Sequence, residues 1–325
     1  MKALVVRGLG IYAIEEVPKP KPNRDEVLVQ VGVAGFCRTD LKIIRHGHRD
    51  LVLPCIPGEE VVGTVVEMGE GVNDLRIGER VYIYPGISCK KCKNCNKGAE
   101  NLCENMRIMG FHRPGGFAEY VTSPASSVIR IPEQLDFETA VFLEPLSCCL
   151  NALELGALKE GESVGIWGGG PAGNLLKRAS SAMGANPTVI EPDPKRRAFL
   201  GGLEEPKGQI FDLCIVAVSS PIAYKEAISH LAPRGRLVVF SGLLPKEETL
   251  LVDFNLIHYL EQTIVGAYGC SHRHALYALE LLINGRVEVK DLITHRLPLD
   301  QLETALDIVE GRRGMKVLIY PNIQR

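Results

Sequence analysis

The sequence predicts a two-domain α/β protein in which a domain of short β-strands is interrupted by a domain with a parallel sheet. Residues 1–140 are rich in Val, Gly and Pro, and short apolar runs recur between Gly and Pro residues. Beyond them, apolar runs of strand length alternate with segments of helical periodicity, and the last forty residues become strand-like again. We therefore expect one domain from 1–142 with 285–325, and a second, inserted domain from 143–284.

The expected elements follow this division. In the first domain, a small barrel or bent sheet is expected from strands at Glu26–Val33, Val61–Met68, Arg80–Tyr84, Ala118–Thr122 and Ser127–Ile131, with a helix at Gln301–Glu310 and a last strand at Lys316–Tyr320. Helical spacing runs from Phe137 to Leu158. The second domain is then expected to contain strands at Ser163–Trp167, Pro187–Glu191, Leu213–Val218 and Leu237–Ser241, and helices at Ala172–Met183 and Ile222–Leu231.

Composition excludes several classes of protein. The 325 residues are 46% hydrophobic and 23% charged with a net charge of −2, which is typical of a globular protein with a core and gives no basic excess for nucleic acid. No apolar run approaches the roughly 18 residues of a membrane span, and the N-terminus lacks the apolar core of a signal peptide. A cytoplasmic protein is expected, whose ten cysteines are thiols or metal ligands rather than disulfides.

Four cysteines form the strongest motif in the chain. Cys89, Cys92, Cys95 and Cys103 follow the spacing C-x2-C-x2-C-x7-C in a loop rich in Lys, Asn and Gly. Four thiolates this close can converge on a tetrahedral zinc ion, and the lysines offset part of their negative charge. Nothing nearby completes a catalytic set, so a structural zinc is expected. Disulfides and an iron–sulfur cluster remain the alternatives.

A glycine-rich segment lies between a predicted strand and a predicted helix. The pattern G-x-G-x-x-G in this position is the fingerprint of a Rossmann dinucleotide-binding domain, where the phosphates lie at the helix N-terminus. The first glycine permits the tight turn, the second lets the pyrophosphate approach the backbone, and the third lets the helix pack closely. The cofactor loop is therefore expected to comprise Gly168, Gly170, Pro171, Ala172 and Gly173.

Charged residues after the next strand bear on the choice of cofactor. Glu191 lies 18 residues beyond Gly173, where a carboxylate can bind the ribose hydroxyls and repel a 2′-phosphate. This position favours NAD. Arg196 and Arg197 follow closely, so that NADP stays possible.

The chain resembles the medium-chain, zinc-dependent alcohol dehydrogenases, in the group that includes sorbitol and threonine dehydrogenases. The resemblance covers almost the whole length and is carried by GFCRTDLK, PGEEVVGTVVEMGEGV, the four-cysteine loop, GGFAEYV, FLEPLSCCLNAL, the glycine fingerprint and LITHRLPLDQLETAL. It implies a GroES-like catalytic domain, a Rossmann domain, and an active site in the cleft between them. It also implies a homodimer or homotetramer that acts on a small alcohol or carbonyl compound.

The resemblance assigns expected roles to five residues. Cys37 matches the first ligand of a catalytic zinc, and Thr39 matches the hydroxyl residue that passes on the substrate proton. Glu60 matches the acidic residue behind the metal. Glu144, in EPLS, matches the carboxylate at the ligand position of the polyol dehydrogenases. Cys148 falls one helical turn later, where the family contacts nicotinamide.

One departure from the family concerns the metal directly. The family has Gly-His-Glu where this chain has Gly58-Glu59-Glu60, so that Glu59 replaces the histidine ligand. The expected ligands of a catalytic metal are then Cys37, Glu59 and Glu144, with Glu60 able to rotate in. The alternative is that Glu59 turns away and no catalytic metal binds.

Two other departures are smaller. Lys42 takes the place of a proton-relay histidine, and His46 and His48 are expected to be solvated loop residues. The stretch after Arg197 is shorter than usual for this domain, which predicts that one peripheral element of its sheet is lost.

The leading hypothesis is an NAD(P)-dependent oxidoreductase that interconverts a secondary alcohol or polyol and its ketone by metal-assisted hydride transfer. The first alternative is a zinc-independent reductase on the same scaffold, which retains only the structural zinc. The second is a non-catalytic NAD-sensing protein. The sequence does not predict the substrate.

Overall fold

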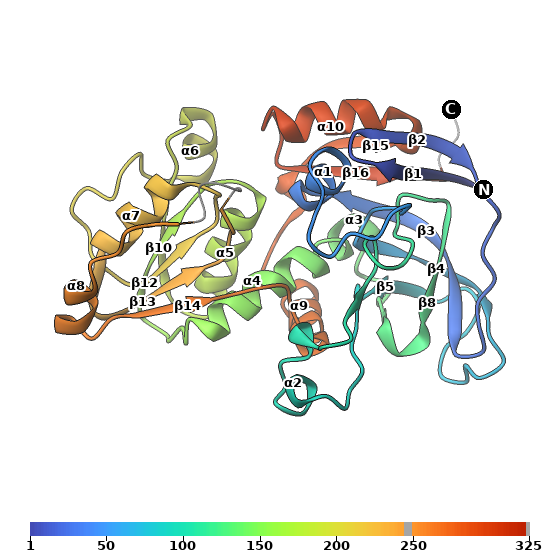
Figure 1. Cartoon of the computed structure of the whole chain (residues 1–325), viewed down its shortest axis with the longest axis horizontal. Helices are drawn as coiled ribbons and strands as arrows, with labels where there is room; N and C mark the ends of the chain where they lie inside the picture. Colours follow the sequence, from blue (N-terminus) through green and yellow to red (C-terminus); the bar gives the residue numbers. More distant parts are fainter. Residues whose placement is uncertain (244–248, 323–325) are drawn as a thin grey trace. The chain divides into compact units, whose positions relative to one another are not determined.

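The computed structural model describes residues 1–243 and 249–322, which form two compact units (Figure 1). The first unit contains Met1–Glu144, Ser271–Ile283 and the chain from Val289 onward. The second contains Pro145–Cys270 and Asn284–Glu288. Within the described ranges, no helix combines the length and the apolar character needed to cross a membrane.

The first unit is built around one long strand, β3 (Glu26–Phe36). β3 pairs antiparallel with β4 (Glu60–Met68) over most of its length. Its other edge pairs with β8 (Tyr120–Pro124) near the start and with β16 (Lys316–Tyr320) near the end. Segments from both ends of the chain therefore lie side by side in one sheet.

The other strands of the first unit extend this sheet or form small ribbons. The main sheet also contains β5 (Arg80–Ile83), β9 (Val128–Arg130) and β15 (Ile293–Pro298), while β1 (Lys2–Gly8) pairs with β2 (Ile11–Glu16) and β6 (Gly86–Ile87) with β7 (Arg107–Ile108). The helices are α1 (Arg38–Arg45), α2 (Lys93–Asn96), α3 (Phe137–Ala140), α9 (His272–Ile283) and α10 (Leu302–Glu310).

Alternation along β3 explains where the first core lies. Val27, Val29 and Val31 are fully buried and belong to one hydrophobic cluster. Because successive side chains of a strand point to opposite faces, these three valines lie on the same face of the sheet. The apolar period of two that predicts the strand is therefore also what places it over the core.

The second unit is a parallel sheet with helices packed on it, as the sequence predicts. The strand order is β11-β10-β12-β13-β14, and every neighbouring pair is parallel. The strands are β10 (Ser163–Trp167), β11 (Asn186–Ile190), β12 (Phe211–Val216), β13 (Leu231–Val239) and β14 (Thr263–Gly266). The helices are α4 (Leu143–Leu155), which begins in the first unit, α5 (Pro171–Ala182), α6 (Pro194–Leu200), α7 (Pro221–Ser229) and α8 (Phe254–Tyr259).

The sheet of the second unit lacks one strand of the usual nucleotide-binding arrangement. A six-stranded Rossmann sheet has the order 3-2-1-4-5-6, whereas in the described part of this chain the sheet ends at β11, the equivalent of strand 2. Only Leu203 occupies the place of strand 3: its N–H donates to Val189 O and its carbonyl accepts from Glu191 N, both at 2.8 Å. The predicted loss of a peripheral element is confirmed.

The segment containing α9 differs from the expected division of the chain. The predicted boundary places residues 271–283 in the inserted domain, whereas in the structure they are part of the first unit. The reason lies in long-range contacts: the backbone N–H of His272 donates to Glu100, and its ring packs edge-on against Tyr84 at 5.7 Å. The remaining domain boundaries stay a prediction.

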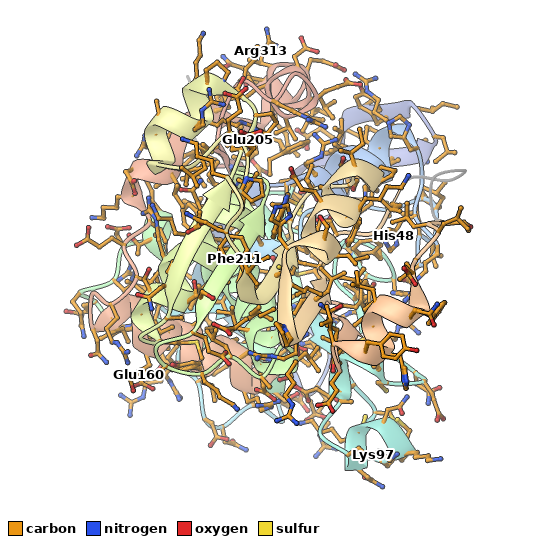
Figure 2. All side chains as sticks on the ribbon, turned by 90° about the vertical axis from the view of Figure 1, so that its left-hand side faces the viewer. His48, Lys97, Glu160, Glu205, Phe211 and Arg313 are labelled. Carbon is orange, nitrogen blue, oxygen red and sulfur yellow. The ribbon has the colours of Figure 1, made fainter. Side chains whose placement is uncertain are left out.

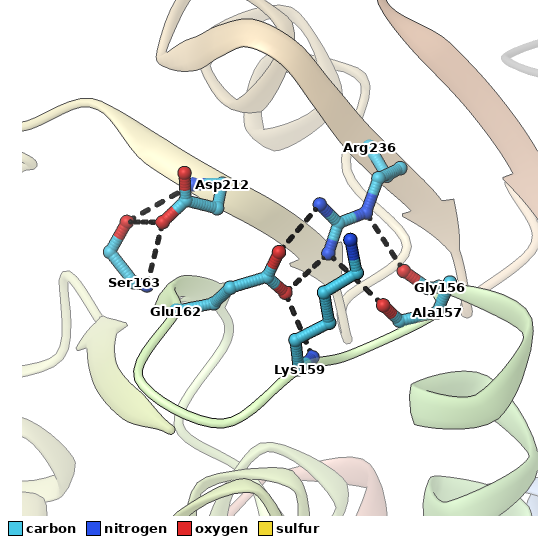
Figure 3. Close-up of polar contacts among 7 residues, drawn as sticks. All are labelled: Gly156, Ala157, Lys159, Glu162, Ser163, Asp212 and Arg236. Carbon is cyan, nitrogen blue, oxygen red and sulfur yellow. Dashed lines mark hydrogen bonds and ion pairs between the residues drawn. The ribbon is translucent and has the colours of Figure 1, made fainter. Parts of the chain in front are cut away.

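A polar network holds the turn that leads from α4 into β10 (Figure 3). Arg236, on β13, forms hydrogen bonds to both carboxylate oxygens of Glu162 and donates through Nε to Gly156 O at 2.9 Å. Beside it, Asp212 Oδ2 accepts from the N–H of Ser163 at 2.9 Å and from its hydroxyl at 2.7 Å. Both side chains of the Arg236–Glu162 pair are less than one-fifth exposed. The network therefore fixes the start of β10, and with it the glycine-rich loop that follows.

Arg236→Met should destabilise the second unit by about 1–3 kcal/mol, because it leaves Glu162 and the Gly156 carbonyl without their charged donor. Burial raises the pKa of Glu162, but the hydrogen bonds from Arg236 and from the Lys159 backbone outweigh it, so the net pKa is lowered. The parent should therefore gain this stability above the usual glutamate pKa and lose it as the pH falls through the lower folded-state pKa. Urea denaturation at several pH values measures both effects.

Arg234→Met is the matched control, because Arg234 lies on the same strand and pairs with Glu261 while both side chains are more than 60% exposed. It should change the stability by less than about 0.5 kcal/mol. Equal destabilisation by the two variants would contradict the role given to Arg236.

Candidate active site and metal centre

The first candidate site starts at Cys37, where β3 ends and α1 begins. The backbone N–H of Cys37 donates to Asp40 Oδ2 at 2.8 Å, and Asp40 Oδ1 accepts from the N–H of Gly58 at 3.1 Å. Asp40 is 1% exposed. This one carboxylate therefore fixes both the turn after β3 and the loop before β4. Burial raises the pKa of Asp40 to about 7, although its hydrogen bonds from Cys37 act in the opposite direction.

Glu59 lies beside Cys37 because of the conformation of Gly58. Gly58 has φ +100°, and a Cβ there would lie 2.9 Å from the backbone nitrogen of Phe117. The next side chain, Glu59, is then directed to Cys37, with 3.9 Å between Cys37 Sγ and Glu59 Oε1. The structure thus brings together two of the three expected ligands, and it turns Glu59 toward the cysteine.

Glu60 is held by a buried cation that sequence reasoning missed. Lys316, the first residue of β16, contacts the Glu60 carboxylate, and the two residues are 3% and 1% exposed. Gly35 is the register partner of Glu60 on β3, and a Cβ at Gly35 would lie 1.8 Å from Glu60 Oε2. A glycine at position 35 is therefore required for the carboxylate to lie over the strand.

The residues around Cys37 form an acidic cluster, which carries more negative than positive charge if its acids are ionised. Its members are Cys37, Asp40, Glu59, Glu60 and Lys316. Burial raises the pKa of the Cys37 thiol well above its ordinary value, and the charges of Asp40 and Glu59 raise it further. Burial, and after it the charge of Glu144, likewise raises the pKa of Glu59. An excess of buried acidic donors of this kind is stabilised by a bound cation.

Lys316 is the cation that opposes this excess. Burial would lower the pKa of Lys316, but the charges of Glu60, Cys37 and Glu144 outweigh it and the pKa is raised. Lys316 therefore stays charged, and its attraction acts on Glu60 first.

The remaining residues expected near this site have varied surroundings. Thr39 lies in the first turn of α1 and is partly exposed, and Lys42 lies one turn further along the same helix. His46 ends the helix and is exposed. His48 packs edge-on against Phe111 at 4.9 Å, so it is partly buried rather than fully solvated.

The four predicted zinc ligands converge in the loop around α2. The sulfurs of Cys89, Cys92, Cys95 and Cys103 all lie within 4.8 Å of one another. Cys92 Sγ is 3.4 Å from Cys95 Sγ and 3.9 Å from Cys103 Sγ. The loop is otherwise polar, and Lys97, at the end of α2, is exposed (Figure 2).

Backbone amides favour the thiolate form in this loop. The N–H groups of Cys89 and Asn105 donate to Cys103 Sγ at 3.2 and 3.3 Å. Hydrogen bonds from the backbone of Lys91 and Cys92 lower the pKa of Cys89 to about 6. The pKa of Cys92 is lowered as well, whereas burial and the neighbouring thiols raise the pKa of Cys95 to about 11. The loop therefore has the ligand number of a tetrahedral metal site, and two of its four thiols are already inclined to the thiolate form that metals bind.

The glycine fingerprint forms the expected turn between β10 and α5. Gly168 has φ +108°. A Cβ at Gly173 would lie 1.8 Å from Gly168 O, so only a glycine at position 173 lets α5 pack against this turn. Gly170 is the N-cap of α5 and Pro171 is its first residue. A Cβ at Gly170 would have only Arg196 Nη1 near it, at 4.0 Å. The backbone at Gly170 therefore has open space beside it, which fits the close approach of a phosphate to this glycine.

Glu191 and Asn174 hold this loop. Glu191 Oε2 accepts from Gly169 N at 2.6 Å, and its Oε1 accepts from Asp193 N at 2.9 Å. Asn174 Nδ2 donates to the carbonyls of Gly169 and Gly170, both at 3.2 Å. The expected ribose ligand is therefore also a structural part of the phosphate loop, and Asn174 is a second residue that the sequence reasoning missed.

Arg197 and Cys148 complete the expected cofactor residues. Arg197 donates to the carbonyls of Glu191 and Pro192 and pairs with Glu204, so it is engaged in the loop after β11. Cys148 lies on α4, one helical turn after Glu144.

The residues that sequence reasoning missed share one property. Asp40, Lys316 and Asn174 carry ordinary polar side chains with no metal-binding or cofactor spacing. Asp40 did have a local signal, because an acidic residue three positions after a helix N-cap can accept from the cap backbone. Lys316 had none, since its partner Glu60 is 256 residues away.

Comparisons with known proteins agree with this geometry. Residues 23–133 match the model of the alcohol dehydrogenase GroES-like domain. Sorbitol dehydrogenase of Bacillus subtilis (strain 168) is 28% identical, over 99% of this chain and 98% of its own length. L-threonine 3-dehydrogenase of Coxiella burnetii (strain Dugway 5J108-111) is 28% identical, over 94% and 95%.

A solved structure extends the match to the whole fold. A protein described as a zinc-binding dehydrogenase from Sinorhizobium meliloti 1021, bound to NADP, is 30% identical with a TM-score of 0.91. The match covers 98% of this chain and 99% of that one. The chain therefore belongs to the medium-chain, zinc-type family of NAD(P)-dependent alcohol dehydrogenases.

Proposed function

We propose that this protein oxidises a secondary alcohol or polyol to its ketone with NAD, and catalyses the reverse reaction, with a divalent metal held by Cys37, Glu59 and Glu144. The observation that carries the proposal is the pairing of Cys37 Sγ with Glu59 Oε1 at 3.9 Å in an acidic cluster that also contains the buried Asp40 and Glu60. Glu59 thus occupies the place of the family's histidine and faces the cysteine ligand.

The donor set fits a divalent metal. A thiol and carboxylates are ligands that zinc accepts, and the cluster has an excess of acidic groups over the single charge of Lys316. Lys316 Nζ contacts both oxygens of the Glu60 carboxylate, which holds Glu60 in place beside the donor set. A bound zinc ion would act here as a Lewis acid that makes the substrate hydroxyl easier to deprotonate.

The chain's own residues then have separate tasks. Cys37, Glu59 and Glu144 would hold the metal, and Lys316 would keep the Glu60 carboxylate in place behind it. The Thr39 hydroxyl, at the start of α1, would take up the substrate proton and pass it toward solvent. The loop from Gly168 to Gly173 would bind the cofactor pyrophosphate at the N-terminus of α5.

The cofactor is proposed to be NAD because of Glu191. Its carboxylate is 7% exposed and each oxygen accepts one backbone hydrogen bond, so each keeps capacity for a ribose hydroxyl. A 2′-phosphate in this place would meet a negative charge. Arg196 lies near Gly170 and is the residue that would favour NADP.

The four-cysteine loop is proposed to bind a structural zinc ion. Replacing Cys103 with Ser should remove one zinc ion per chain and lower the stability by on the order of 3 kcal/mol, because metal binding contributes folding free energy. Cys55→Ser, at a buried cysteine outside the loop, should leave the zinc content unchanged. Metal analysis by mass spectrometry checks both, and an unchanged zinc content in Cys103→Ser would disprove the assignment.

Glu59→His tests the catalytic metal. The substitution removes one negative charge from the donor set, so the Lewis acidity of the metal rises. The metal should be retained, and the pH at which alcohol oxidation reaches half its limiting rate should fall by on the order of one unit. Metal content and pH–rate profiles of both proteins measure this.

Glu67→His is the control for Glu59→His, because Glu67 lies on the same strand, β4, and is exposed. It should change neither the metal content nor the pH at which alcohol oxidation reaches half its limiting rate. If the parent binds only the structural zinc and Glu59→His alters neither metal content nor rate, the zinc-independent reductase becomes the better description.

Glu191→Ala tests the cofactor preference. The ratio of NAD to NADP affinity should fall about tenfold, because the repelling charge is gone. Affinity for NAD should also fall in absolute value, since Gly169 N loses its acceptor. Glu204→Ala is the control at a neighbouring exposed carboxylate and should leave the ratio unchanged. Dissociation constants of NAD and NADP for the parent and both variants measure this ratio. A parent that prefers NADP would refute the role of Glu191.

A further inference from the structure

Two cysteines of the second unit face each other beside Glu144, one of the proposed metal ligands. Cys148 lies on α4, and Cys270 follows β14. Their sulfurs lie within 4.8 Å of each other, Cys270 is 6% exposed, and Cys148 is partly exposed.

The pairing is fixed by the neighbouring backbone. One turn after Cys148, the Asn151 side chain donates to Gly269 O at 2.9 Å. Gly269 has φ +59°, so the chain turns immediately before Cys270. This hydrogen bond holds α4 against the turn, and the two sulfurs are kept close as a result.

Both cysteines also lie close to points where the chain leaves the second unit. α4 passes from the first unit into the second between Glu144 and Pro145, four residues before Cys148. Cys270 is the last residue before the chain returns to the first unit at Ser271. A covalent bond between these cysteines would therefore join two of the segments that connect the units.

We propose that Cys148 and Cys270 form a reversible disulfide by exchange with a small-molecule disulfide. Rotation about χ1 moves a cysteine sulfur by about 3 Å, so a change of side-chain rotamer brings the two sulfurs together. Glu144 also offers a carboxylate oxygen within 4.8 Å of both sulfurs, so a metal ion shared by Glu144, Cys148 and Cys270 is the alternative that the zinc content of Cys270→Ser tests, whereas a disulfide needs only the two thiols.

The exchange proceeds in two balanced steps. Cys148, the more exposed thiol, attacks glutathione disulfide as the thiolate, forms a mixed disulfide, and releases one glutathione. Cys270 then attacks the Cys148 sulfur, forms the intramolecular disulfide, and releases the second glutathione. The two protons end on the two glutathione thiols, and the two cysteines are oxidised while the reagent is reduced.

The functional consequence rests on the proposed function. Cys148 occupies the position at which the family resemblance implies contact with nicotinamide. A disulfide turns this side chain toward Cys270 and fixes α4 to the segment after β14. We therefore expect oxidised protein to lose most of its alcohol oxidation rate, and dithiothreitol to restore it.

The experiment uses the full-length, zinc-loaded protein, because bound zinc protects the four loop cysteines. After treatment with glutathione disulfide, the remaining thiols are alkylated and the protein is digested with trypsin. Mass spectrometry should show peptide 131–159 joined to peptide 247–273, and the link should disappear in Cys148→Ser and in Cys270→Ser. Cys149→Ala is the matched control, because Cys149 is in the same peptide but its sulfur is directed to Ala172 O. It should keep the link.

The outcomes separate this proposal from the proposed function. Absence of the joined peptides, or their loss in Cys149→Ala, overturns the disulfide whatever the enzyme's substrate. A lower zinc content in Cys270→Ser also overturns it, since the thiols would then be metal ligands. In the activity assay, Cys270→Ser should keep its own rate during oxidation. Formation of the Cys148–Cys270 link in the parent with no change in the parent's rate of alcohol oxidation would overturn the regulatory role alone.

Discussion

The first unit depends on one buried ion pair, between Glu60 on β4 and Lys316 on β16. Removing either charge alone would leave the other buried without a partner, which in proteins costs about 3–5 kcal/mol. The two strands are held on either side of the end of β3. The chain must therefore return from the second unit and add β16 before Glu60 has its cationic partner.

The same pair separates two kinds of carboxylate in the cluster. Glu60 has a permanent cationic partner, whereas Glu59 has an acidic neighbourhood and a thiol 3.9 Å away. A side chain in the second situation either takes up a proton or shares a metal ion. Glu59, which the resemblance places at the family's histidine, is therefore the carboxylate at which the proposed metal would bind.

The sequence predicted what is encoded locally. The four cysteines lie within 15 residues, and the glycine fingerprint lies within six, so spacing alone indicated their chemistry. The shortened sheet was also predictable, because too few residues separate Arg197 from β12. Lys316 and the affiliation of α9 could not be predicted, since each depends on partners that are distant in the sequence. Asp40 had a local capping signal, but its second partner, Gly58 N, becomes evident only in the fold. Glu191 was predicted at the correct strand end. Its hydrogen bond from Gly169 N could not be predicted, because it depends on how the turn after β10 folds in three dimensions.

The loss of the third strand leaves β11 as the outer strand of a parallel sheet, a position where open backbone groups can recruit a strand from another molecule. Here Pro187 offers no N–H at all, and Leu203 satisfies the carbonyl of Val189 and the N–H of Glu191. A proline and one bridging residue thus reduce the number of open backbone groups at this edge. The edge of β11 therefore offers fewer open backbone groups to a strand of another molecule than an uncovered edge would.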